Sequence, residues 1–388
     1  MTEVVLPPVV RDVPGQDQAA AFLARALANP HHAYLFAGPE GSGKRLAMRA
    51  FAAAILCHRG GCGECRDCRL ALGERHPNMV VLEPGGPDIL VGKDASDPNT
   101  ARWFAARVYL TPPEPGRKVM VVLQADRLRI EAADVLLKVL EEPPLDTLFV
   151  LLSARPDDLP DTVRSRCQEV GFPPLSEEFV VQTLVAEGLD AERARLACRL
   201  AGGNIGRARR LAVDDRQLTA FREDSLAAAG QAFQGPGGAL AAAELMTAAA
   251  KQFRARLAEE LEEDLRPFLD DQGRPEEPFR GVVRRLEEQH ERRLRRAERE
   301  FLDWSLLSLA AYWRDVVLVS SGGDPGLVVN LDKDVGGGAV GADGSASEAA
   351  RAWGAVEEAR ADLADETNLN ARLILERLFL RLSELRPA

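Results

Sequence analysis

The sequence predicts an α/β module built on a parallel sheet, followed by a small helical unit and a longer all-α part. Apolar runs of strand length alternate with helical patterns up to about residue 172, only helical spacing follows in 173–213, and the helical period continues through most of 214–388. Strands that alternate with helices form a parallel sheet covered on both faces. A chain of 388 residues has room for about two or three such domains.

The expected elements of the α/β part follow one another in a regular order. Apolar residues at helical spacing predict helices over Gln18–Asn29 and Ala132–Glu142. Short apolar runs predict buried strands, and these lie at Ala33–Ala37, Met79–Leu82, Val119–Leu123 and Phe149–Leu152. The segment 84–99 is rich in Pro, Gly and Asp and is expected to form a surface loop.

Two features interrupt the helical C-terminal part. The segment 322–347 contains a Gly-rich insertion without an apolar period, whose function the sequence does not reveal. The run Arg280–Glu300 mixes Arg and Glu at helical offsets. A helix that faces DNA is one interpretation, and a solvated helix laced with ion pairs is the favoured one.

The composition is that of an ordinary globular protein, with 46% hydrophobic and 28% charged residues. A net charge of −11 argues against a chain that coats nucleic acid by itself, although a local basic surface is compatible with it. The sequence opens without a basic and apolar leader, and the longest apolar run, Trp304–Trp313, is too short to span a bilayer. We therefore expect a cytoplasmic protein without a membrane partner.

The segment GPEGSGKR fits the phosphate-binding P-loop pattern G-x-x-x-x-G-K and lies between a predicted strand and a predicted helix. Its candidate phosphate-binding residues are Gly38, Gly41, Gly43, Lys44 and Arg45. Glycines let backbone N–H groups turn toward a phosphate, and the helix N-terminus adds a partial positive charge. The residue after Lys44 should be Ser or Thr, whose hydroxyl binds Mg²⁺. Because Arg45 cannot bind a cation, the P-loop is degenerate.

A P-loop hydrolase also needs a second buried strand that ends in acids, which serve Mg²⁺ and the attacking water. The candidate strand ends in Leu123 and Gln124 instead, and Asp126 lies about two residues too late to fill both roles. We therefore expect no ATP hydrolysis by this chain in its own site and no Mg²⁺ site. The sequence leaves open whether ATP binds weakly or not at all.

Four of the six cysteines lie in one short segment with the spacing C-x4-C-x2-C-x2-C. This spacing favours a structural Cys₄ zinc site over disulfides, whereas four unrelated thiols or a redox pair are the alternatives. The predicted zinc ligands are Cys57, Cys62, Cys65 and Cys68. The other two cysteines, Cys167 and Cys198, are expected to be small buried residues.

Several segments, taken in this order, resemble bacterial clamp-loader AAA+ subunits. They are HHAYLFAGPEGSGK, the four-cysteine insertion, HPN, AADVLLKVLEEPP and DLPDTVRSRC, and they span roughly Val13–Ala208. Near the C-terminus, TNLNARLILERLFLRL looks like the closing helices of the family's collar domain. The resemblance implies an AAA+ P-loop module over 1–172 with the cysteine insertion at 57–68, a helical lid over 173–213 and a helical collar over 214–388.

The resemblance also implies partners and a role for one arginine. Related subunits belong to the clamp loader of the DNA polymerase III holoenzyme, a hetero-pentameric ring with tau/gamma and delta subunits that places a sliding clamp on primer–template DNA. In them, the arginine of the motif Ser165-Arg166-Cys167 reaches the γ-phosphate of ATP bound by the neighbour. Arg166 is therefore expected to act in trans, and the alternative is that it pairs with a surface carboxylate.

Three functions compete on this basis. The missing acids and Arg45 point, within the family, to the non-hydrolysing delta-prime class. The main alternative is a catalytically active ATPase subunit of the tau/gamma type, against which residues 45, 123 and 124 all argue. The third is a zinc-bearing adaptor without a part in the ATP cycle, against which the Ser165-Arg166-Cys167 motif argues.

Overall fold

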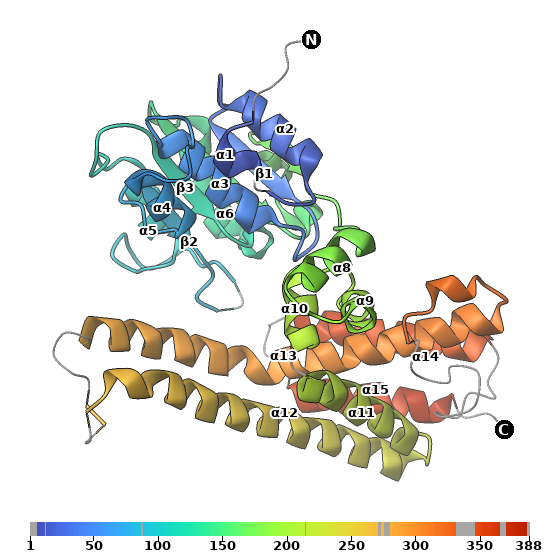
Figure 1. Ribbon diagram of the computed structural model, residues 1–388. Helices are drawn as coiled ribbons and strands as arrows, with labels where there is room; N and C mark the ends of the chain where they lie inside the picture. Colours follow the sequence, from blue (N-terminus) through green and yellow to red (C-terminus); the bar gives the residue numbers. More distant parts are fainter. Residues whose placement is uncertain are drawn as a thin grey trace. The chain divides into compact units, whose positions relative to one another are not determined.

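The computed structural model describes residues 6–11, 13–86, 88–213, 215–270, 273–274, 280–330, 346–364 and 370–385. The chain divides into two compact units, Met1–Arg209 and Arg210–Ala388 (Figure 1). The first unit carries a parallel sheet and the second is helical, so the predicted fold class is confirmed. Most of the predicted Gly-rich insertion, residues 331–345, lies outside the described residues.

The sheet of the first unit has five parallel strands in the order β2-β3-β4-β1-β5. Their bounds are β1 Ala33–Ala37, β2 Met79–Leu82, β3 Lys118–Val122, β4 Thr147–Ser153 and β5 Gln168–Gly171. Every residue of β1, β3 and β4 is buried, as expected for strands covered on both faces. The four apolar runs found in the sequence are all strands, displaced by at most two residues.

The sequence does not predict β5. This strand lies at the edge of the sheet beside β1, and of its residues only Val170 is buried. An exposed edge strand needs no continuous apolar run, so hydrophobicity alone does not reveal it.

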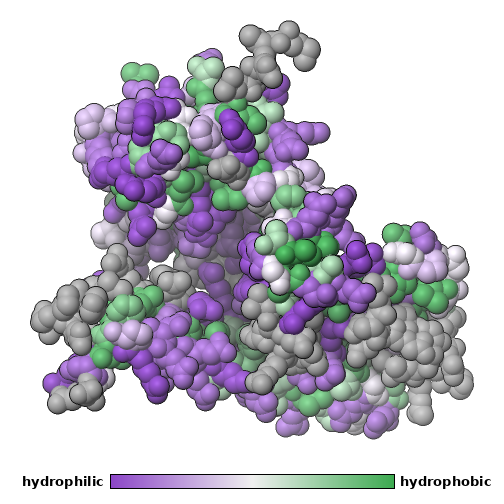
Figure 2. Space-filling view, viewed as in Figure 1, coloured by the Kyte–Doolittle hydropathy of each residue, from purple (hydrophilic) through white to green (hydrophobic). Residues whose placement is uncertain are grey.

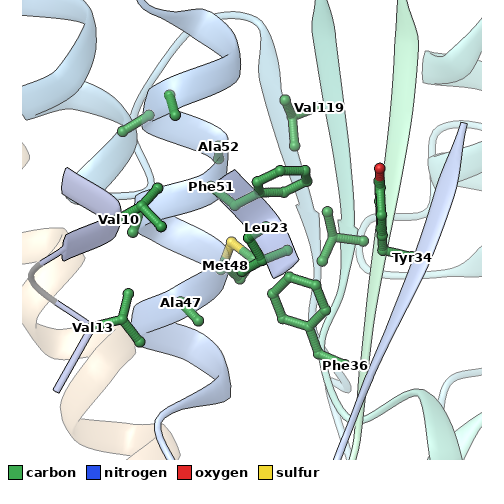
Figure 3. Packing of buried hydrophobic residues seen from close by; sticks show 14 of the residues in the cluster. Val10, Val13, Leu23, Tyr34, Phe36, Ala47, Met48, Phe51, Ala52 and Val119 are labelled. Atoms are coloured by element: carbon green, nitrogen blue, oxygen red, sulfur yellow. The ribbon is translucent and has the colours of Figure 1, made fainter. Parts of the chain in front are cut away.

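Helices cover both faces of the sheet. The helices of the first unit are α1 Pro8–Arg11, α2 Asp17–Ala26, α3 Lys44–Leu56, α4 Arg66–Leu72, α5 Ala101–Val108, α6 Ile130–Glu141, α7 Asp161–Arg164, α8 Glu177–Ala186, α9 Ala191–Leu200 and α10 Ile205–Val213. Alternation along β1 directs Tyr34 and Phe36 to the core under α1–α4, where Met48 and Phe51 of α3 pack (Figure 3). Leu35 points to the opposite core, under α5 and α6.

The described part of the second unit consists mainly of long helices. Their bounds are α11 Asp215–Ala232, α12 Pro236–Leu265, α13 Arg280–Ser320, α14 Ala346–Ala364 and α15 Ala371–Glu384. None of the described helices is long and apolar enough to cross a membrane. Because the boundary between the units falls inside α10, the finer division into module, lid and collar stays a prediction.

The charged first half of α13 pairs with arginines of its own unit. Glu298 lies 3.3 Å from Arg254, and Glu300 lies 2.6 Å from Arg210. The visible side of α12 and α13 is largely hydrophilic (Figure 2). These pairs favour the solvated, ion-paired interpretation of the run over a helix that faces DNA.

A buried carboxylate organises the second unit. Asp315 of α13 is fully buried, and its Oδ2 accepts hydrogen bonds from the backbone N–H groups of Val329 (3.0 Å) and Asn330 (2.8 Å) and from the Asn330 side chain (2.8 Å). Arg314 donates to its Oδ1, and Arg222 of α11 donates to the Asn330 side chain. A buried charge needs such partners, so the network ties the segment after α13 to two helices.

We expect Asp315→Ala to lower the free energy of unfolding by about 3–5 kcal/mol, because it leaves the buried N–H groups of Val329 and Asn330 without their acceptor. Glu298→Ala, on the same helix, breaks only an exposed pair and should cost about 1 kcal/mol or less. Urea denaturation followed by circular dichroism measures both, and equal costs would contradict the anchoring role.

Candidate functional site

The P-loop joins β1 to α3, and close contacts require its glycines. Gly38, Gly41 and Gly43 have φ angles of 153°, 78° and 91°, a region that favours glycine. A Cβ on Gly38 would lie 2.0 Å from the carbonyl oxygen of Phe172, and one on Gly41 would lie 2.2 Å from the Asn204 side chain. The loop is therefore packed between the residue after β5 and the start of α10.

Two polar groups of the loop suit a phosphate. Lys44 begins α3, and its buried Nζ donates to two carbonyl oxygens of the loop itself, one of them that of Pro39 at 2.7 Å. Burial lowers the pKa of Lys44, whereas the charges of Glu40 and Asp126 oppose this shift. The Ser42 hydroxyl is buried without a hydrogen-bond partner among the described residues. A phosphate at the N-terminus of α3 would give the Ser42 hydroxyl a partner and would pair with the charge of Lys44, so the residues fit a nucleotide.

The structure shows how Asp126 lies relative to the loop. Leu123 and Gln124 do follow β3, but Gln124 adopts a left-handed conformation (φ 51°, ψ 53°) that turns the chain back. The turn buries the Asp126 carboxylate at the end of β4, where its Oδ1 accepts from Ser153 Oγ (2.9 Å) and Ala154 N (3.0 Å). One acid therefore lies near the loop lysine, although it is engaged in hydrogen bonds and has no second acid after β3.

Arg45 points to Glu74, a residue that the sequence analysis did not single out. Its Nε and Nη2 donate to the two carboxylate oxygens of Glu74, both at 2.6 Å, and Arg49 donates to the same carboxylate at 2.7 Å. Burial alone would raise the pKa of Glu74, but these two arginines outweigh it and lower the pKa. The sequence did offer one signal for this contact. Arg45 and Arg49 are four residues apart and therefore lie on one face of α3, where two neighbouring positive charges favour an acidic partner. The residue that would bind Mg²⁺ in a P-loop hydrolase is thus an arginine that is paired with a glutamate.

The four predicted zinc ligands come together. Their sulfur atoms all lie within 4.8 Å of one another, with Cys57 Sγ at 3.8 Å from Cys62 Sγ and at 3.6 Å from Cys65 Sγ, and Cys62 Sγ at 4.0 Å from Cys68 Sγ. Zinc–sulfur bonds of about 2.3 Å in a tetrahedron place the sulfur atoms roughly 3.8 Å apart. None of the six cysteines forms a disulfide. The cluster therefore fits one tetrahedral metal ion without rearrangement.

The cysteines of this cluster differ in pKa, because burial raises the pKa of Cys68. Burial alone would raise the pKa of Cys57, but backbone N–H groups of the same turn outweigh it and lower the pKa to about 6. Outside the cluster, burial raises the pKa of Cys167 to about 12 and that of Cys198 to about 11. Both thiols are therefore unreactive, and Cys198 is buried as expected, whereas Cys167 is only partly buried.

A second group of potential ligands lies beside the cysteines. The buried His76 presents Nε2 at 3.8 Å from Asp67 and at 3.9 Å from Glu114, and its Nδ1 accepts from the backbone N–H of Asn78. Arg66 already lies 2.9 Å from Glu114 and 3.6 Å from Asp67. Because a guanidinium already pairs with both carboxylates, we interpret this group as an ion-pair cluster that fixes α4 to the segment before β3.

Arg166 lies between α7 and β5, and its side chain is about a third exposed. It donates to the carbonyl oxygen of Thr162 at 2.8 Å and to the side chain of Glu141 at the end of α6. Within this chain it therefore pairs with a surface carboxylate, and a role at a neighbour's nucleotide stays a prediction.

Comparison with known proteins identifies the module that carries these residues. Residues 15–176 match the family model described as "DNA polymerase III, delta subunit". This segment, less than half of the chain, is therefore similar to members of that family. The chain is 37% identical over 188 residues to the DNA polymerase III subunit delta' of Pseudomonas aeruginosa, a match that covers 46% of this chain and 55% of the relative.

Two relatives from Bacillus subtilis, one from each subunit class, can be compared with this chain. Its subunit delta' is 34% identical over 187 residues, covering 47% of this chain and 54% of the relative, whereas its subunit tau is 30% identical over 226 residues, covering 56% and 39%. The chain thus spans about half the length of the curated delta' relatives it matches. The family match contains the P-loop, the cysteine cluster and Arg166, so the resemblance inferred from the motifs is confirmed for this segment.

We expect the purified chain to contain one zinc ion, and Cys65→Ser to lose it and to unfold at lower temperature, because structural zinc contributes directly to folding. Cys167→Ser, outside the cluster, should keep the metal. Elemental analysis together with a thermal melt tests both variants. A metal-free wild-type chain that melts at the same temperature as the zinc-loaded chain would exclude a structural metal.

Proposed function

We propose that this chain is a non-hydrolysing subunit, of the delta-prime type, in a DNA polymerase III clamp loader. In this role it joins tau/gamma and delta subunits in a hetero-pentameric ring, supports ATP-driven opening of the sliding clamp, and helps to place the clamp on primer–template DNA. The observation that carries the proposal is Arg45: an intact phosphate loop has a guanidinium, held by Glu74, where magnesium needs an oxygen ligand. Sequence identity of 34–37% to delta' relatives, over about half of each chain, supports the same class.

The surroundings of the loop support the absence of hydrolysis. Metal-assisted phosphoryl transfer needs oxygen ligands for Mg²⁺ and a group that orients the attacking water. Residue 45 supplies no oxygen, and Leu123 carries no polar group at the end of β3. Asp126 is engaged by Ser153 and Ala154.

The loop retains what is needed to hold phosphates. Lys44, the Ser42 hydroxyl and the N–H groups at the start of α3 would bind the phosphate groups of ATP, which would supply negative charge to the site. The residues fit such a ligand, and without a metal its binding is expected to be weak. A structural Zn²⁺ on the four cysteines completes the proposed cofactors.

Arg166 is proposed to serve ATP that a neighbouring subunit binds. A guanidinium keeps its charge and presents a planar fork that suits phosphate oxygens. Both Arg166 and its partner Glu141 are substantially exposed, 34% and 47%, so their ion pair adds little stability and can be exchanged for a phosphate.

A hydrolysing subunit of the tau/gamma type is the competing function. The observation that favours it is Asp126, an acid close enough to the loop for its charge to raise the pKa of Lys44. Similarity to the Bacillus subtilis tau subunit covers more of this chain but at lower identity. An ATPase measurement on the purified chain separates the two proposals.

We expect the purified chain with Mg²⁺ and ATP to release phosphate no faster than its Lys44→Ala variant, because no metal ligand follows Lys44. A coupled phosphate-release assay measures both rates. Magnesium-dependent turnover that disappears in Lys44→Ala would instead establish the tau/gamma-type function.

In a reconstituted ring, Arg166→Ala should assemble normally but load clamps more slowly. An arginine finger contributes about 10³–10⁵ in rate at its own site, and loss at one of several sites gives a smaller total effect. Arg166→Lys should not rescue, because it lacks the planar fork. Arg164→Ala, which removes an arginine from the preceding helix turn, serves as the control. Clamp loading at the wild-type rate by Arg166→Ala would refute the finger assignment.

A further inference from the structure

The residue that ends α4 in a left-handed conformation is a glutamate, Glu74, where glycine would be less strained. The N–H groups of Gly73, Glu74 and Arg75 donate back to carbonyl groups of α4, as at an ordinary helix terminus. Glu74 adopts a left-handed conformation there, with φ 55°. Glycine normally occupies this position because a side chain is strained in it. A glutamate at such a site suggests that its carboxylate has a use.

The use of the carboxylate is visible in its contacts. The Glu74 side chain is only 12% exposed and accepts two hydrogen bonds from the fork of Arg45 and one from Arg49. Both arginines lie on α3, the helix that begins at the P-loop. Glu74 therefore connects the end of the cysteine-bearing helix α4 to the first turn of the helix that would receive a phosphate.

Arg45 follows Lys44 directly, at the position where a P-loop protein carries the hydroxyl that reaches the phosphate-bound metal. A guanidinium at this position has a choice between two kinds of anion, since carboxylate and phosphate oxygens both accept its planar fork. In the structure the fork is on Glu74, with Glu83 3.8 Å away on the same side. While the fork stays there, it is not available to a ligand in the loop.

We propose that Glu74 restrains Arg45 and thereby sets the affinity of the P-loop for a nucleoside triphosphate bound without magnesium. When the restraint is removed, the guanidinium turns to the phosphate groups and replaces the charge of the missing metal. The inference rests on the proposed use of the loop as a phosphate site. It makes Glu74 a positioning residue, because it acts on the ligand only through Arg45.

The test measures ATP binding to the full chain by isothermal titration calorimetry in buffer without Mg²⁺. Glu74→Gln, which keeps the shape but not the charge, should bind ATP about tenfold more tightly than wild type, within the usual range of coupling between sites. The gain should disappear in the double variant Glu74→Gln/Arg45→Gln. The matched control is Arg49→Gln, which removes the other partner of Glu74 but leaves the fork of Arg45 in place, and it should bind like wild type.

A second variant covers the case in which Glu74→Gln does not fold. Glu74→Asp keeps the charge on a shorter side chain that cannot reach both donors of the fork equally well, and it should give a smaller gain. Equal affinity of Glu74→Gln and wild type, a gain that persists in the double variant, or no ATP binding by any folded variant would overturn the inference. The experiment uses the isolated chain, so its result is independent of ring assembly and clamp loading, on which the proposed function is tested.

Discussion

The parallel pairing of β1 with β4 is the constraint on which the candidate site depends. Carboxyl ends of parallel strands meet at one edge of the sheet, and there the N–H of Gly38 donates to the carbonyl oxygen of Ser153 across the pair (3.2 Å). This bond sets the first glycine of the loop against the residue whose hydroxyl binds Asp126. Strand direction thus brings the loop and the hydroxyl to one edge, and the turn at Gln124 adds the acid.

The charges at this edge are organised differently from those of a metal-dependent site. In a metal-dependent site, oxygen ligands point to the metal ion. Here Arg45 instead binds Glu74, and the buried Lys44 donates hydrogen bonds to carbonyl groups of its own loop. The cysteine turn and α4 are not peripheral in this arrangement. They carry Glu74 to α3, so the small module inserted after the P-loop helix determines where the side chain of residue 45 points.

Local features of the site were predictable, and features that depend on distant contacts were not. The P-loop and the cysteine spacing could be interpreted because their ligand atoms come from residues close together in the sequence. The contact between Arg45 and Glu74 spans 29 residues, and no periodic pattern links the two. The position of Asp126 depends on a left-handed turn at Gln124, a conformation rare for residues other than glycine. The edge strand β5 is not predictable from hydrophobicity, because most of its residues are exposed and polar.

The register of β5 has a consequence for Arg166. The strand pairs with β1 from Gln168 opposite Tyr34 to Gly171 opposite Ala37. Arg166 precedes the strand, whereas the P-loop begins where β1 ends. At ~3.3 Å per residue the paired strands alone separate these two points by on the order of 10 Å, and the arginine is turned to Glu141 at its own end. Within this chain, Arg166 and the P-loop therefore lie at opposite ends of these paired strands.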